Sequence, residues 1–171
     1  MRLVIIVGVP GSGKTTLAKR IAHDSCICEA DKYPDLYQNG VLQKELLSHA
    51  HQWCQAQVKE RMVARVKTIV QSNTNLELSH IYPYLELAHL HSYSVKIITP
   101  SYSLLHYPFD TKRDVQTDKL CVVRSSGERL IPIPIMKRLI ATFDKNILSI
   151  VKIASHTDPQ LIINEMEKVQ S

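Results

Sequence analysis

The residues best suited to carry chemistry form a glycine-rich stretch near the amino terminus. Residues 8–16 read Gly-Val-Pro-Gly-Ser-Gly-Lys-Thr-Thr and fit the pattern G-x-x-x-x-G-K-[ST] at every fixed position. In such a loop the glycines let the backbone approach a phosphate closely, while backbone N–H groups and the positive end of the next helix hold the anion. The predicted phosphate-binding residues are Gly8, Gly11, Ser12, Gly13, Lys14, Thr15 and Thr16.

Two residues of this loop have more specific predicted roles. Lys14 would reach the β- and γ-phosphates of a nucleoside triphosphate, and the Thr15 hydroxyl would bind Mg²⁺. A chance glycine turn before an ordinary helix is the alternative. The context argues against it, because residues 2–7 have the apolar, β-branched composition of a buried strand and residues 16–22 have helical spacing. The sequence therefore predicts a site for ATP or GTP with Mg²⁺, in which Lys14 is a catalytic residue.

Polar residues follow the next two predicted strands. Asp31 and Lys32 come after the strand expected at 25–30, and residues 72–75, Ser-Asn-Thr-Asn, come after the strand expected at 67–71. Carboxyl ends of parallel strands meet at the edge where open α/β folds bind ligands. Asp31 is a candidate general base for an acceptor hydroxyl, although a helix cap or a solvated loop carboxylate would look the same. The predicted substrate-binding residues are Asp31, Lys32, Asn73, Thr74 and Asn75.

Residues 101–131 have no clear periodicity and mix Tyr, Pro, Asp, Thr, Lys and Arg. Long irregular segments in compact domains are often lids or binding loops. A lid arginine can neutralise charge on a transferred phosphoryl group, and the catalytic candidates in this segment are Arg113, Arg124 and Arg129. A solvated basic loop is the alternative for each of them.

The pattern as a whole predicts a single α/β domain over residues 1–171, a three-layer sandwich with a mostly parallel central sheet and a lid at about 101–131. Further expected helices lie at about 43–66, 76–91 and 135–143 and after Asp158, with Pro83 in or near the first turn of the second of these. Further expected strands lie at 93–98 and 147–153.

Composition narrows the class of protein. The net charge of +5 suits a polyanionic partner such as nucleic acid without requiring one. The four cysteines have no C-x-x-C spacing, which favours a reduced, cytoplasmic protein over a disulfide framework or a zinc site. No apolar run approaches the length of a membrane span, so no membrane partner is expected.

Several blocks stand in an order that resembles a known family. They are the phosphate loop at 8–15, Ala-Asp-Lys-Tyr at 30–33, Ala-His-Gln-Trp-Cys at 50–54, Ser-Asn-Thr-Asn at 72–75 and the segment 131–139. Together they resemble the polynucleotide-kinase-like group of P-loop kinases, which includes the kinase domain of the phage 5′-hydroxyl polynucleotide kinase. The resemblance covers about residues 2–143.

The resemblance implies roles for individual residues. Lys14 and Thr15 match the phosphate and Mg²⁺ residues, and Asp31 matches the general base that acts on the 5′-hydroxyl. Two departures stand out: Pro34 occupies the place of an arginine that grips the substrate phosphate, and Ser72 and Asn73 stand where the group usually has an aspartate. The family's lid arginine would be Arg124 or Arg129.

These observations support three hypotheses. The first is an ATP- and Mg²⁺-dependent kinase that transfers the γ-phosphate to the 5′-hydroxyl of RNA or DNA, with a nucleic-acid end as partner. The second is a P-loop kinase for a small alcohol such as a nucleoside. The third is a nucleotide-binding module without catalysis.

Overall fold

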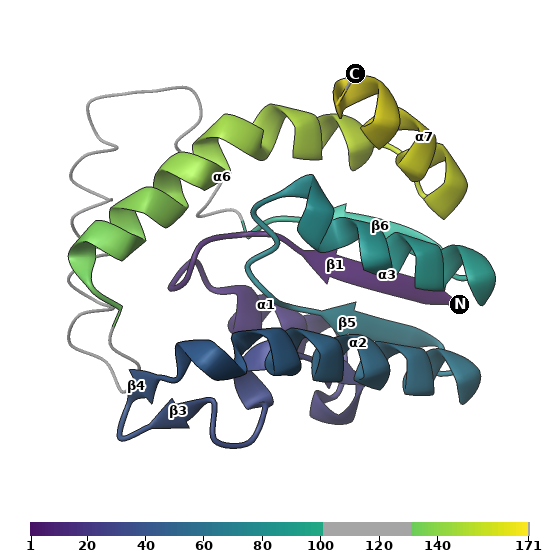
Figure 1. Cartoon of the computed structure of the whole chain (residues 1–171). Coiled ribbons are helices and arrows are strands. Elements are labelled where there is room, and N and C mark those ends of the chain that lie inside the picture. Colours follow the sequence, from purple (N-terminus) through teal and green to yellow (C-terminus); the bar gives the residue numbers. More distant parts are fainter. Residues whose placement is uncertain (101–130, 171) are drawn as a thin grey trace.

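A computed structural model describes residues 1–100 and 131–170 of the chain. Its centre is a four-stranded parallel sheet in the order β2-β5-β1-β6 (Figure 1). Parallel strands need long crossover connections, and helices supply them here. The strands are β1 (Arg2–Ile6), β2 (Ile27–Cys28), β5 (Thr68–Gln71) and β6 (Ser94–Ile98), and the connecting helices are α1 (Lys14–Ile21), α2 (Leu47–Val63) and α3 (Leu78–Leu90).

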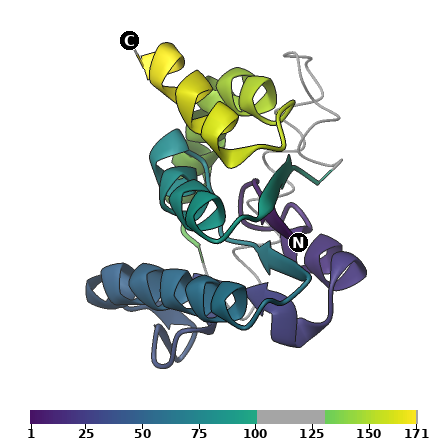
Figure 2. The same ribbon diagram turned by 90° about the vertical axis from the view of Figure 1, so that its right-hand side faces the viewer.

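Helices cover both faces of the sheet. Alternate side chains of a strand point to opposite faces, so Leu3 and Ile5 of β1 join the larger apolar cluster with α2 and α3, whereas Val4 and Ile6 join a smaller one with Ala18 of α1. Figure 2 shows α1 on one side of the strands and α2 and α3 on the other. The predicted α/β architecture, a mostly parallel sheet between helical layers, is confirmed.

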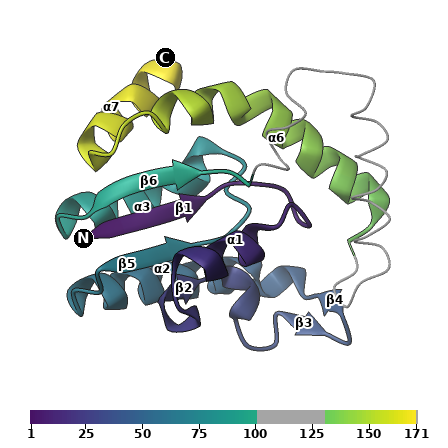
Figure 3. The same ribbon diagram turned by 180° about the vertical axis from the view of Figure 1, so that it is seen from behind.

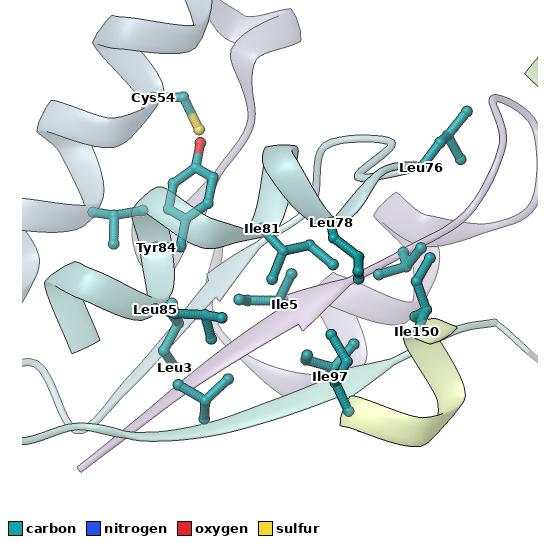
Figure 4. Packing of buried hydrophobic residues seen from close by; sticks show 14 of the residues in the cluster. Leu3, Ile5, Cys54, Leu76, Leu78, Ile81, Tyr84, Leu85, Ile97 and Ile150 are labelled. Carbon is teal, nitrogen blue, oxygen red and sulfur yellow. The ribbon is translucent and has the colours of Figure 1, made fainter. Parts of the chain in front are cut away.

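The larger cluster fixes the strand that leads into the glycine loop. Leu3 and Ile5 pack against Ile81 and Leu85 of α3 and Ile97 of β6, and each of these side chains is at most 4% exposed (Figure 4). Interiors packed in this way resist displacement of their elements. The end of β1, and therefore the start of the glycine loop, is held in a definite position.

The carboxyl-terminal part of the chain is helical. The predicted helix at 135–143 is part of a longer one, α6 (Ile133–Ile153), and the predicted strand at 147–153 is wrong. Spacings of three and four residues between buried side chains describe one helical face, and this face packs into the larger cluster. The buried residues are Met136, Ile140, Phe143, Ile147, Ile150 and Ile153.

The last helix, α7 (Pro159–Gln170), begins as predicted. Asp158 Oδ1 accepts a hydrogen bond from the Gln160 N–H at 2.8 Å, which is N-cap geometry, and Pro159 is the first helical residue. The Val95 N–H of β6 donates to the Thr157 carbonyl at 2.7 Å and so ties this segment to the sheet edge. Figure 3 shows α6 running from the side of the sheet where β1 ends back to α7.

The segment between α1 and α2 is more broken than predicted. Instead of a strand over 25–30, a 3₁₀ turn at Asp24–Cys26 and another at Ala30–Lys32 flank the two residues of β2. Residues 37–42 form a small hairpin of β3 (Tyr37–Gln38) and β4 (Val41–Leu42). Asn39 and Gly40 have φ of 50° and 77°, which primed hairpin turns require. A 3₁₀ turn at Lys44–Leu46 then precedes α2.

Pro83 lies inside α3, deeper than the first turn in which it was predicted. Proline lacks the N–H that would reach the carbonyl four residues earlier. That carbonyl belongs to Ser79, which is exposed, so water can satisfy it.

The predicted lid lies almost wholly outside the described residues, since 101–130 are not described. Arg113, Arg124 and Arg129 fall in that segment. Among the helices that the structure does describe, none has both the length and the apolar character that crossing a bilayer needs.

Candidate functional site

The glycine loop between β1 and α1 has the backbone of an anion cradle. Gly11 and Gly13 have φ of 83° and 90°, a region that other residues rarely adopt. A Cβ built on Gly13 would meet nothing within 4 Å, so the space over this point of the loop is open. Ser12 Oγ is buried without a hydrogen-bond partner among the described residues. The loop therefore has both the room and an unused polar group that a phosphate would fit.

Two hydrogen bonds hold the loop to the segment after β5. The Gly8 N–H donates to the Thr74 carbonyl at 2.9 Å, and Asn75 Nδ2 donates to the Ile6 carbonyl at 2.8 Å. Asn75 is 2% exposed and also exchanges hydrogen bonds with the buried Gln71. Asn75 was predicted to contact substrate, but its side chain lies inside the protein, where it positions the loop.

This buried amide gives a prediction about stability. We expect Asn75→Ala to lower the free energy of unfolding by about 1–3 kcal/mol more than Asn39→Ala does, because it leaves the Ile6 carbonyl and the Gln71 amide unpaired. Asn39 is a matched control, since its φ of 50° is close to the 51° of Asn75 while its side chain is exposed. Urea unfolding of the two variants measures the difference. Equal losses would show that the buried hydrogen bonds contribute nothing beyond the backbone conformation.

The first residues of α1 present a lysine and a hydroxyl beside the loop. Lys14 Nζ donates to the Val9 carbonyl at 2.9 Å, so its ammonium lies over the loop itself. Thr15 Oγ1 donates to Glu29 Oε1 at 3.2 Å. Lys14, Thr15 and Thr16 form the first turn of α1, which contains no acidic residue and is preceded by Gly13, which has no capping side chain. This helix end is thus suited to an external anion.

Glu29 was not identified from the sequence. It directly follows β2 and is 7% exposed, although carboxylates are rarely so buried without partners. Its second oxygen, Oε2, lies 3.5 Å from Lys32 Nζ. The sequence signal was a charged residue inside the apolar run 27–30, two positions before Asp31.

Asp31 is exposed and interacts with the hairpin and with α2. Tyr37 OH donates to Asp31 Oδ1 at 3.4 Å. Burial lowers the pKa of His51, the neighbouring His80 lowers it further, and the Asp31 carboxylate opposes both effects. The fold thus brings His51 of α2 into electrostatic range of Asp31.

Asn73 links the two strand ends that carry these groups. Its Oδ1 accepts the Ala30 N–H at 2.8 Å, and its Nδ2 lies 3.4 Å from Tyr84 OH and 3.6 Å from Cys54 Sγ. Burial raises the pKa of the Cys54 thiol and the Tyr84 phenol. Through its hydrogen bond with the Ala30 N–H, Asn73 holds the backbone just before Asp31.

The buried thiol of Cys28 lies in β2, at the sheet edge near Glu29. Burial raises the pKa of Cys28 to about 12, so this thiol is protonated at neutral pH and inert as a nucleophile. No three His, Cys, Asp or Glu side chains converge on a metal-sized site within 1–100 and 131–170. The catalytic candidates Arg124 and Arg129 lie outside those ranges and stay predictions.

Residues 3–105 match a protein-family model described as an AAA domain. The chain belongs to this family. It is a P-loop kinase-like family that includes polynucleotide kinase domains, so the predicted resemblance is confirmed. Membership of this family supports nucleotide binding of the kinase-like type. The matched residues include the loop at 8–16, Asp31 and the segment 72–75.

A named relative agrees with this assignment. The chain is 31% identical over 143 residues to NEDD4-binding protein 2 from Homo sapiens, an alignment that covers 78% of this chain. It covers 8% of that much longer protein, so the chain corresponds to a small part of it.

Proposed function

We propose that this chain is an ATP- and Mg²⁺-dependent kinase that transfers the γ-phosphoryl group to the 5′-hydroxyl of RNA or DNA. The observation that carries the proposal is the contact between the first turn of α1 and the segment that follows β2. The Thr15 hydroxyl in the first turn of α1 contacts Glu29, and Asp31, two residues further along, is exposed and accepts a hydrogen bond from Tyr37 OH. The phosphate-binding loop and the exposed Asp31 carboxylate are thus linked through β2 and the residues that directly follow it.

The residues of the chain divide the work of phosphoryl transfer. Backbone N–H groups of the loop and the Lys14 ammonium bind and orient the phosphates and offset their charge. Asp31 Oδ1 or Oδ2 accepts the proton of the acceptor hydroxyl as that oxygen attacks the γ-phosphorus. The bond from the γ-phosphorus to the β–γ bridging oxygen breaks, and ADP leaves. Most of the rate enhancement then comes from positioning and from electrostatic stabilisation.

The loop also fits a divalent cation. Mg²⁺ takes oxygen ligands and is usually held by one or two protein groups with phosphates and waters, and the Thr15 hydroxyl with the Glu29 carboxylate at 3.2 Å supplies such groups. When bound, the ion would neutralise charge on the β- and γ-phosphate oxygens.

A transfer assay with matched acceptors tests the proposal. Protein is incubated with γ-labelled ATP and one oligonucleotide prepared with either a 5′-hydroxyl or a 5′-phosphate, as RNA and as DNA. We expect label only on the 5′-hydroxyl forms. If ATP is bound but no oligonucleotide is labelled, the proposed acceptor is wrong.

One observation favours a smaller acceptor as a second candidate. Pro34, which is exposed, stands where the family resemblance predicts an arginine for the substrate phosphate. A small alcohol without a phosphate would not need that arginine. Binding of a polynucleotide should weaken steeply with salt, whereas binding of an uncharged nucleoside should not, so the salt dependence of KM separates the two.

A further inference from the structure

We infer that Glu29 is the carboxylate that binds the nucleotide-bound Mg²⁺ together with Thr15, in place of an acidic residue at position 72 or 73, just after β5. This inference rests on the proposed function, because it assigns the metal side of the same site.

The contact between Thr15 and Glu29 has the right direction for this role. A hydroxyl has one proton and two lone pairs. Because Thr15 Oγ1 donates its proton to Glu29 Oε1 at 3.2 Å, its lone pairs are turned toward other groups and are available to a cation. Because Glu29 Oε1 lies 3.2 Å from Thr15 Oγ1, the carboxylate can bind the same ion directly or through a coordinated water.

The strand between β1 and β2 supplies no charge for this purpose. After β5 the chain continues with Ser72, Asn73, Thr74 and Asn75, all neutral. Ser72 sits directly beside β2, since its N–H donates to the Cys28 carbonyl at 3.0 Å, and its Oγ is buried without a hydrogen-bond partner among the residues described. Among the residues that the structure describes, Glu29 is the carboxylate that contacts the Thr15 hydroxyl.

Glu29 is a nearly buried carboxylate whose charge is balanced by a partly exposed lysine, which a divalent cation could replace. Its side chain is 10% exposed, and a buried carboxylate without a positive partner is costly. Lys32 Nζ, 3.5 Å from Oε2, now supplies that positive charge. The Lys32 side chain is 41% exposed, so it has room to turn toward solvent when a divalent ion takes its place.

Metal binding, rather than turnover, tests this assignment. Mn²⁺, which is paramagnetic and substitutes for Mg²⁺, is titrated into protein with saturating ADP and followed by electron paramagnetic resonance. We expect Glu29→Gln to weaken Mn²⁺ binding by about 10- to 100-fold. Gln keeps the size of the side chain and can still accept the Thr15 hydroxyl, so circular dichroism should match the wild type. The matched control is Asp31→Asn, which should retain wild-type Mn²⁺ affinity and lose phosphoryl transfer.

The outcomes separate this inference from the proposed function. Unchanged Mn²⁺ affinity in a folded Glu29→Gln protein overturns the inference and leaves the kinase proposal standing. Failure of the wild type to bind Mn²⁺ with ADP overturns both. Should Glu29→Gln not fold, anomalous scattering from wild-type crystals with Mn²⁺ and ADP decides: an ion beside Thr15 and Glu29 supports the inference, and an ion away from Glu29 contradicts it.

Discussion

Replacing Lys14 by Met is expected to reduce kcat for phosphoryl transfer by about 100- to 1,000-fold, the usual loss when one preorganised charge-stabilising donor is removed. The ammonium lies over the loop in this structure, 2.9 Å from the Val9 carbonyl. Charge builds on the phosphate oxygens during transfer, and Met fills similar space without offsetting that charge. Steady-state assays with saturating ATP and acceptor measure the effect.

Lys19 offers a matched control on the same helix. It is exposed and pairs loosely with Asp24 at 3.9 Å, so Lys19→Met removes the same charge from α1 away from the loop. Exposed pairs of this kind contribute little, and kcat should stay near the wild-type value. Equal activity losses in the two lysine variants would contradict the role assigned to Lys14.

Asp31→Asn is expected to lower kcat by about 100- to 10,000-fold, the range for loss of a positioned general base. Asn has nearly the same shape and can still accept the Tyr37 hydroxyl, whose oxygen lies 3.4 Å from Asp31 Oδ1. Nucleotide binding should be retained, because the loop at 8–16 is untouched. Single-turnover transfer and ADP binding, measured on the same preparation, separate chemistry from affinity.

The control for this change is Asp35→Asn. Asp35 is also exposed and lies four residues further on, with a φ of 59° that Asn tolerates well. It should leave transfer unaffected. If Asp31→Asn retains full activity, Asp31 is not the base. Absence of transfer by the wild type, with nucleotide binding retained, would instead favour the nucleotide-binding module.

The parts of the fold that were predicted correctly are those whose local pattern matches their final environment. Gly11 and Gly13 have positive φ, a conformation that glycine adopts more readily than other residues. The positions of the glycines in the sequence therefore predict the loop conformation directly. Asp158 and Pro159 form a helix start through contacts within a few residues. Such elements depend on few distant partners, so sequence alone specifies them.

The errors arose where tertiary contacts decide. Residues 147–153 are rich in isoleucine, which favours strands, yet Ile147, Ile150 and Ile153 continue the buried face of α6. A window extended back to Met136 would have shown the helical period. Asn75 resembled a surface loop residue, and only the contact with Ile6, from a strand distant in sequence, shows that it is structural.

The site residues also divide into those predicted from the sequence and those that only the structure identifies. The loop residues and Asp31 have the spacing of a known motif, whereas Glu29 is identified only by its contact with Thr15 of α1. The parallel sheet makes that placement, since β2 pairs with β5 and β5 with β1. A charged residue in an apolar strand run is therefore worth testing as a site residue whenever that strand ends beside a phosphate loop.

A crystal structure with a non-hydrolysable ATP analogue, Mg²⁺ and a short 5′-hydroxyl oligonucleotide would test directly whether the loop and Asp31 form one kinase site. We expect the β- and γ-phosphates over residues 11–15 and an Asp31 carboxylate oxygen about 2.6–3.2 Å from the 5′-hydroxyl. Phosphates bound elsewhere, or an Asp31 side chain turned away from the terminal hydroxyl, would contradict it.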